Sequence, residues 1–159
     1  AYLIIEQQVS FKAAITIKNR FIDKVRDLTN DEIIQLSDKE LQSVGISFRK
    51  ATYIKNVFKY FKENSYDFLS ASNQEVIDEL TKIKGIGVWS SEMFLMFVLM
   101  RIDIFSKGDL ALMNSIKINY KIDIKDDSKL NTLVDSWSPY KSVASLLLWK
   151  SIEEKYFFT

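Results

Sequence analysis

One segment, residues 80–109, constrains the fold more than any other part of the chain. It reads LTKIKGIGVWSSEMFLMFVLMRIDIFSKGD. Gly85 and Gly87, separated by one hydrophobic residue, allow a sharp backbone turn that carries no side chain where the glycines stand. The pattern predicts the end of one helix, a tight hairpin over residues 83–87, an apolar helix from residue 88 to about residue 101, and a loop that ends at Asp109.

The same turn is a predicted phosphate site. Because the second helix starts directly after Gly87, its unpaired amide groups and the positive end of its dipole point out of the turn together. Such a helix start binds phosphate oxygens. The best donors are the amides of Gly85, Ile86 and Gly87, helped by the side chain of Lys82 or Lys84. A glycine pair of this kind also fits a plain connection between helices, and this alternative stays open here.

The composition favours a helical protein with a sizeable core. Hydrophobic residues make up 47% of the 159 residues, strong helix formers dominate, and Pro139 is the only proline. The fold class expected is all-α. Lys and Arg number 22 against 21 Asp and Glu, which leaves a net charge of +1. Any basic surface for nucleic acid must therefore be local.

The chain contains no cysteine and no histidine. Disulfides, thiol nucleophiles, iron–sulfur clusters and zinc sites built on these residues are therefore excluded, as are imidazole bases. Any chemistry must rest on carboxylates, lysines and aromatic side chains. The most apolar run, residues 93–100, is too short to span a bilayer, and no signal peptide is visible. A cytoplasmic location is expected, and because a helical apolar pattern is already under way at Ala1, whether further residues precede it stays open.

Four segments carry a resemblance to a known family. In chain order they are QQVSFKAA, LTKIKGIGVWSSEMFLMF, DIFSKGDLAL and WSPYKSVASLLLW. Together they resemble the helix-hairpin-helix (HhH-GPD) DNA glycosylase superfamily, and within it the 3-methyladenine DNA glycosylase II branch, over nearly the whole chain. The resemblance implies two packed helical lobes with the active site in the cleft between them. Residues 1–103 would form the lobe with the helix-hairpin-helix at 80–100, and residues 104–159 the second lobe.

Asp109 is the catalytic residue that the resemblance implies. Cleavage of an N-glycosidic bond passes through an oxocarbenium-like sugar, and an ionised carboxylate can offset that charge and orient or deprotonate water. The alternative is a structural N-cap for a helix over residues 110–120. Both roles can coexist in one residue.

The resemblance also implies hydrolysis without strand cleavage. Superfamily members that cut the backbone place a nucleophilic lysine two residues after the second hairpin glycine, and here that position is Trp89. Without an amine there, Schiff-base chemistry has no obvious agent. A monofunctional enzyme that leaves an abasic site is expected, with Lys82, Lys84 and Lys107 as the nearby amines.

Trp89, Met93 and Tyr140 are the expected pocket for the flipped base. Purines alkylated at N3 or N7 carry a positive charge, which favours stacking on electron-rich rings, and the base must leave the duplex to be reached. Met93 stands where relatives can have a tyrosine, which leaves the breadth of substrates open. For Trp89 and Tyr140, core packing is the alternative.

The resemblance places a DNA-wedging turn near Gln7 and Gln8, where the polar run interrupts the apolar pattern of residues 2–18. Gln8 is the candidate wedge, with Gln7 beside it, and Ser10 is a candidate cap for the next helix. Solvated glutamines are the alternative. The family's hairpins often hold a monovalent cation, so Na⁺ or K⁺ is expected at the carbonyls of Ile83 and Ile86, with no other cofactor.

Three further helix starts carry the capping-box spacing. They are Thr29 with Glu32, Ser37 with Glu40, and Ser72 with Glu75. A longer helix is expected from residue 47 to about 63, and the segment GISFRK at residues 45–50 is assigned a structural role.

These observations favour a monofunctional DNA glycosylase that excises alkylated purines of the 3-methyladenine type from double-stranded DNA in base excision repair. It is expected to be a monomer with no membrane partner, associated with the nucleoid if prokaryotic. The range of excised bases, deaminated purines included, stays open. A non-catalytic helix-hairpin-helix DNA-binding module and a purely structural helical protein are the alternatives.

Overall fold

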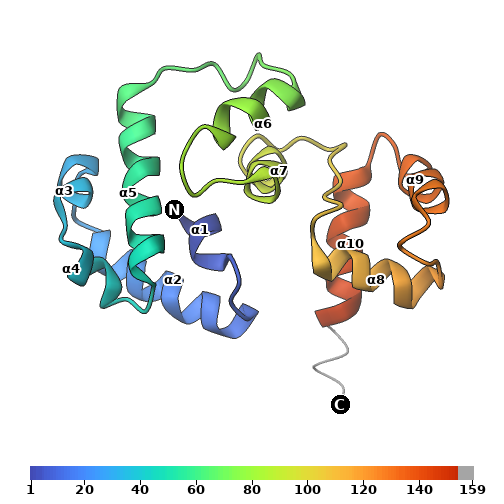
Figure 1. The fold of residues 1–159 in the computed structure, drawn as a ribbon, viewed down its shortest axis with the longest axis horizontal. Coiled ribbons are helices and arrows are strands. Elements are labelled where there is room, and N and C mark those ends of the chain that lie inside the picture. The colour runs from blue at the N-terminus through green and yellow to red at the C-terminus, as the bar shows by residue number, and fades with distance from the viewer. Residues whose placement is uncertain (154–159) are drawn as a thin grey trace. The chain divides into compact units, whose positions relative to one another are not determined.

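The computed structural model describes residues 1–153, and within this range every regular element is an α-helix. This confirms the all-α class expected from the composition. The ten helices of the described range are α1 Tyr2–Glu6, α2 Phe11–Val25, α3 Asn30–Gln35, α4 Asp38–Gln42, α5 Phe48–Glu63, α6 Asn73–Thr81, α7 Val88–Phe97, α8 Leu110–Tyr120, α9 Asp127–Asp135 and α10 Lys141–Glu153 (Figure 1). Across that part of the chain, no helix has the length and apolar character that crossing a membrane requires.

The chain divides into two compact units, Ala1–Ser90 and Ser91–Thr159. The first holds α1 to α6 and the first turn of α7, and the second holds the rest of α7 and the helices that follow.

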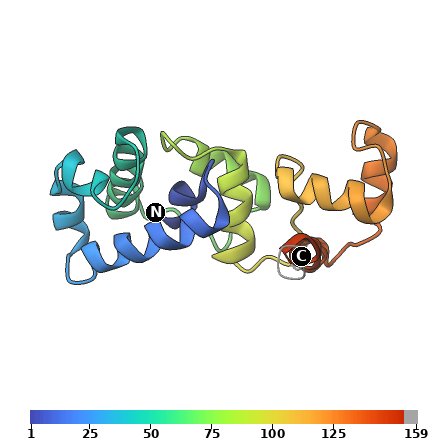
Figure 2. The same ribbon diagram turned by 90° about the horizontal axis from the view of Figure 1, so that it is seen from below.

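The first unit is built around α5. This helix packs against α1, α3 and α4, and α1 packs in turn on α2 (Figures 1 and 2). The core includes Ile4, Ile5, Phe21, Leu41, Val44, Ile46, Ala51 and Ile54. Ile54 is fully buried, and burial of such a side chain stabilises the fold by about 1.5–3 kcal/mol. Truncation of Ile54 to alanine would cost about 2–5 kcal/mol.

Local capping sets the helix starts of this unit. The three predicted capping boxes, at Thr29, Ser37 and Ser72, are confirmed with both reciprocal hydrogen bonds. Ser10 and Ser47 also act as N-caps, and each side chain accepts from an amide three residues later. Each cap satisfies an amide that the helix leaves unpaired, and is worth about 1 kcal/mol.

The second unit is centred on α8, which packs along α10. Its core includes Leu112, Met113, Ile116, Leu130, Val134 and Leu148, with Phe105, Trp137 and Trp149 packed around it. A buried polar contact lies inside this pair: Ser115 Oγ donates to the carbonyl of Leu148, 2.9 Å away. The helix expected over residues 110–120 is present as α8.

Helix α7 ends earlier than the sequence predicted. The expected end was near Arg101, whereas the helix stops at Phe97. Met100 adopts a left-handed backbone with φ 54°, and the amides of Leu99 and Arg101 turn back to the carbonyls of Phe94 and Leu95. The apolar run continues past this point, so the periodicity alone did not mark the end.

Candidate functional site

The predicted hairpin joins α6 to α7 and has little room for side chains at its first glycine. The amide of Ile86 donates to the carbonyl of Ile83 at 2.9 Å, which closes the turn. Gly85 has φ 110°, and a Cβ there would lie 2.2 Å from Cγ of Tyr53 on α5. Both the backbone angle and the tyrosine ring therefore require glycine. Gly87 is exposed, with open space where a side chain would be.

Two side-chain amides hold the hairpin carbonyls. Asn56 on α5 donates to the carbonyl of Lys84 at 3.1 Å. Gln7, in the turn between α1 and α2, donates to the carbonyl of Gly85 at 3.1 Å and to Ser90 Oγ at 2.9 Å. Within the first unit, α5 and the turn between α1 and α2 therefore both hold the hairpin. The second of these is the turn predicted to wedge into DNA.

The two predicted hairpin lysines lie on the surface. Lys82 is exposed and its ammonium pairs with Glu79 at 2.6 Å, a contact that raises the pKa of Lys82. Lys84 is exposed as well. Ile83, whose carbonyl was a predicted cation ligand, is 5% exposed.

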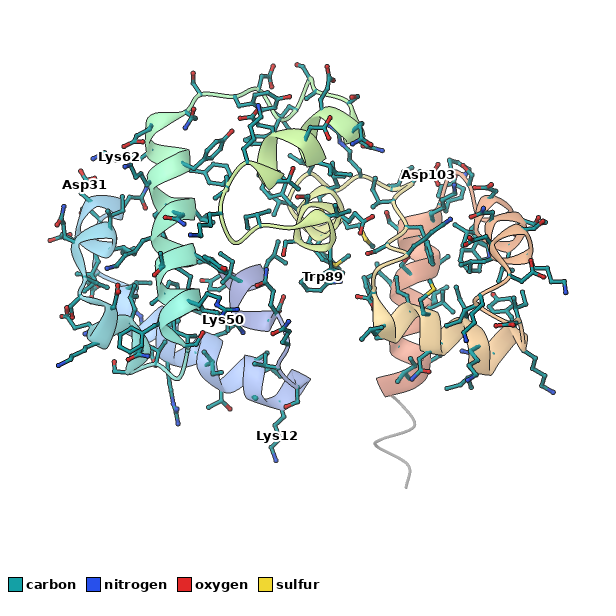
Figure 3. The ribbon with its side chains drawn as sticks, in the orientation of Figure 1. Lys12, Asp31, Lys50, Lys62, Trp89 and Asp103 are labelled. Atoms are coloured by element: carbon teal, nitrogen blue, oxygen red, sulfur yellow. The ribbon has the colours of Figure 1, made fainter. Side chains whose placement is uncertain are left out.

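The turn after α1 presents Gln8. This residue is exposed and has a left-handed backbone with φ 56°. Lys50 on α5 holds this turn: its Nζ donates to the carbonyl of Ile5 at 2.9 Å and to that of Gln7 at 2.5 Å. Burial lowers the pKa of Lys50. In Figure 3 this lysine lies beside α1, and its contacts give the GISFRK segment the structural role expected of it.

Asp109 is the N-cap of α8, which is the structural role that the sequence offered as the alternative to catalysis. Its Oδ1 accepts from the amide of Leu112 at 2.8 Å and from Nε1 of Trp149 at 3.2 Å. Only 8% of its surface is exposed. The carboxylate is therefore oriented by α8 and α10 together, and Trp149 is in turn stacked on Phe97 with ring centroids 5.9 Å apart.

The loop between α7 and Asp109 is pinned by the start of α10. The hydroxyl of Ser142 donates to the carbonyl of Arg101 at 2.7 Å and accepts from the amide of Ile104 at 3.0 Å. Ser138 Oγ donates to Asp103 at 2.7 Å, and Figure 3 marks Asp103 in this loop. The loop is consequently held at several points before it reaches Asp109.

Glu92 is a candidate site residue that the sequence analysis did not identify. It lies on α7 and accepts a hydrogen bond from Ser106 Oγ. Burial raises the pKa of Glu92; the Ser106 hydrogen bond partly offsets this, and the nearby charge of Asp109 adds to it. A signal was present in the sequence, since Glu92 is the single charged residue between Val88 and Met100.

The predicted pocket residues differ in exposure. Trp89, in the first unit, is half-buried near the start of α7 (Figure 3). Met93 lies one turn later on the same helix, in the second unit, and is only 3% exposed. Tyr140, directly before α10, is 59% exposed. Trp137 packs on Phe105, as core packing would require.

Comparison with known proteins matches residues 1–139 to the "HhH-GPD superfamily base excision DNA repair protein" family. The chain is 30% identical over 190 residues to the DNA-3-methyladenine glycosylase of Saccharomyces cerevisiae, covering 94% of this chain and 64% of that protein. A crystal structure of a DNA-3-methyladenine glycosidase from Bacillus halodurans is 38% identical, with a TM-score of 0.75 over 94% of this chain and 72% of that one.

A second solved structure is the 3-methyladenine DNA glycosylase Mag1 of Schizosaccharomyces pombe in complex with abasic DNA. It matches with a TM-score of 0.85 and 28% identity over 96% of this chain and 78% of that one. The chain spans less than two thirds of the length of the Saccharomyces cerevisiae relative. The resemblance found in the four sequence segments is confirmed: the chain belongs to the HhH-GPD superfamily of base excision DNA repair proteins.

Proposed function

We propose that this protein is a monofunctional DNA glycosylase that removes alkylated purines of the 3-methyladenine type from double-stranded DNA and leaves an abasic site. The observation that carries the proposal is Asp109, a carboxylate that the amide of Leu112 and the indole of Trp149 hold at the start of α8. Asp109 also follows the helix-hairpin-helix in the sequence of a chain that belongs to this superfamily, which supports the same conclusion.

Asp109 would act on the sugar. As the bond to the purine lengthens, positive charge develops on the deoxyribose, and an ionised carboxylate close to it stabilises that charge. The same carboxylate can orient the attacking water. The hydrogen bonds from Leu112 and Trp149 to Oδ1 help to orient the carboxylate before the substrate arrives.

Trp89 and Tyr140 would hold the flipped base. A cationic purine gains attraction from electron-rich rings, and uncharged normal purines gain less, so stacking favours the damaged base. Their partial and high exposure leaves ring surface for such a contact. Met93, buried one turn after Trp89, would support the pocket from within α7.

The hairpin and the Gln8 turn would hold the DNA. Amides of residues 85–87, with Lys84 and Lys82, would bind backbone phosphates, and the exposed Gln8 would enter the duplex where the base leaves. A carbonyl oxygen has two lone pairs, so the Ile83 carbonyl can accept from Ile86 and still coordinate Na⁺ or K⁺ together with the Ile86 carbonyl.

Excision from methylated duplexes tests the proposal. The wild-type protein should release methylated purines from duplex DNA under single-turnover conditions, and Asp109→Asn should lose release by two or more orders of magnitude while it still binds abasic duplex. A wild-type protein that binds duplex with a salt-dependent affinity but releases no base would instead be the non-catalytic DNA-binding module.

A further inference from the structure

We propose that Glu92 is a positioning residue for Asp109 and acts through Ser106. The proposal rests on the proposed function of Asp109. Ser106 Oγ donates to the Glu92 carboxylate, and the carbonyl of Ser106 accepts from the Asp109 amide at 3.2 Å. One residue therefore connects α7 with the cap of α8.

Ser106 has no exposed surface. Its hydroxyl faces Glu92 and its carbonyl faces Asp109, so rotation of this peptide would break one contact or the other. Lys107 and Gly108, which lie between Ser106 and the catalytic carboxylate, are both exposed. The Glu92–Ser106 contact thus holds the loop three residues before Asp109.

The beginning of the loop, after α7, is held by contacts that do not involve Glu92. Ser142 binds the backbone of Arg101 and Ile104, and neither bond reaches residues 107–109. Loss of the Glu92 contact would therefore leave the first half of the loop in place and loosen the half that carries Asp109. The expected result is a displaced carboxylate in a folded protein.

A carboxylate suits this tie better than a neutral side chain. A hydrogen bond from a hydroxyl to an ionised oxygen is about twice as strong as one between neutral groups. The half-burial of Glu92 and the proximity of the Asp109 charge work against ionisation. An apolar side chain could fill the same space in this helix without the free-energy cost of burying a carboxylate.

Four variants separate positioning from folding. Glu92→Leu and Ser106→Ala each remove one partner, Glu92→Gln keeps an oxygen that can accept from Ser106, and the double variant of Glu92→Leu with Ser106→Ala tests coupling. The single-turnover excision constant should fall on the order of 10- to 100-fold in Glu92→Leu and in Ser106→Ala, because small misplacements of a catalytic group have effects of that size. Affinity for abasic duplex should stay at the wild-type value.

The conservative variant and the double variant distinguish positioning from a loss of folding. Glu92→Gln should recover most of the rate, and the double variant should be no slower than Glu92→Leu, since both changes break one contact. Tyr60→Phe is the matched control, because it removes a hydrogen bond of the same kind, from the Tyr60 hydroxyl to the Glu79 carboxylate in the first unit, and keeps the ion pair between Glu79 and Lys82. It should leave the excision constant unchanged at a temperature where every variant is folded.

The inference is overturned if Glu92→Leu excises at the wild-type rate, if the two single effects multiply in the double variant, or if the rate loss follows thermal stability across all variants, Tyr60→Phe included. Asp109→Asn distinguishes this failure from that of the proposed function. An inactive Asp109→Asn beside a normal Glu92→Leu rejects only the role of Glu92, whereas full activity of Asp109→Asn rejects the proposed site, and the role of Glu92 with it.

Discussion

The side-chain amide of Gln7 donates to the carbonyl oxygen of Gly85, 3.1 Å away and 78 residues later in the chain. The same nitrogen also donates to Ser90. Through these two bonds the turn that carries the proposed wedge is attached to the hairpin that is proposed to bind phosphate.

Gln7→Leu should loosen this attachment. The variant leaves the Gly85 carbonyl without its donor, and we expect a loss of about 1–3 kcal/mol in the free energy of unfolding, measured by urea titration. Gln74→Leu is the control: Gln74 is exposed and bonds only along its own helix, to Asp78, so its loss should stay within about 0.5 kcal/mol. Equal effects of the two variants would contradict the bracing role of Gln7.

Gly85→Ala should disrupt the hairpin. The variant combines a left-handed backbone, which costs a non-glycine residue about 1–2 kcal/mol, with a methyl group placed against the Tyr53 ring. Weaker binding to duplex DNA and a smaller dependence of that binding on salt should accompany the loss of stability. Gly108→Ala meets no atom within 4 Å and should leave stability close to that of the wild type. A Gly85→Ala protein as stable as Gly108→Ala would show that the turn tolerates a side chain.

Acid should weaken the caps of the first unit. Hydrogen bonds from Thr29, Ser37 and Ser72 lower the pKa of Glu32, Glu40 and Glu75 below the ordinary 4.5. Because the folded value lies below the unfolded one, this stabilisation is complete above about pH 4.5 and is lost as the pH falls through the lower folded values.

The measurement for this prediction is the urea midpoint between pH 6 and pH 3. Glu75→Gln keeps an acceptor for the Ser72 amide but cannot titrate, so its midpoint should fall less steeply than that of the wild type. Glu63→Gln, at the end of α5 rather than at a capping box, should not change the slope. A slope that Glu75→Gln leaves unaltered would argue against the cap as a source of acid sensitivity.

Borohydride should trap no covalent complex between the wild-type protein and damaged DNA. A Schiff base needs an amine at the sugar, and the residue two positions after Gly87 is Trp89. The readout is a protein–DNA band on a denaturing gel, with product abasic DNA cleaved only after added alkali. A trapped band that disappears in Lys84→Met, or in Lys107→Met, would identify the responsible amine and reject a monofunctional mechanism.

Local rules explain which features the sequence could predict. Serine or threonine three residues before a glutamate defines a capping box without reference to the rest of the fold, and all three predicted boxes are present. The cap at Asp109 followed from the same logic. The family followed from ordered motifs, which carry more information than any single glycine pair.

Long-range contacts explain what the sequence could not predict. Lys50 looks like one of several basic residues on α5 until its ammonium is found against the carbonyls of Ile5 and Gln7. Glu92 stands out in the sequence only as a lone charge in an apolar helix, and its partner Ser106 is identified only when α7 and the loop after it come together. The chain leaves α7 after Phe97 and adopts a left-handed backbone at Met100, and methionine is not a residue type from which such a backbone can be predicted.

At Gln8, which has a left-handed backbone, the residue that would be best for stability differs from the one proposed to serve repair. Glycine would adopt φ 56° without the steric penalty of a side chain, so Gln8→Gly would relieve strain, yet it would remove the amide proposed to fill the gap left by a flipped base. Laboratory evolution for heat tolerance alone would therefore drift toward glycine at residue 8, while survival under methylating agents would keep glutamine. The two selections would diverge at this codon.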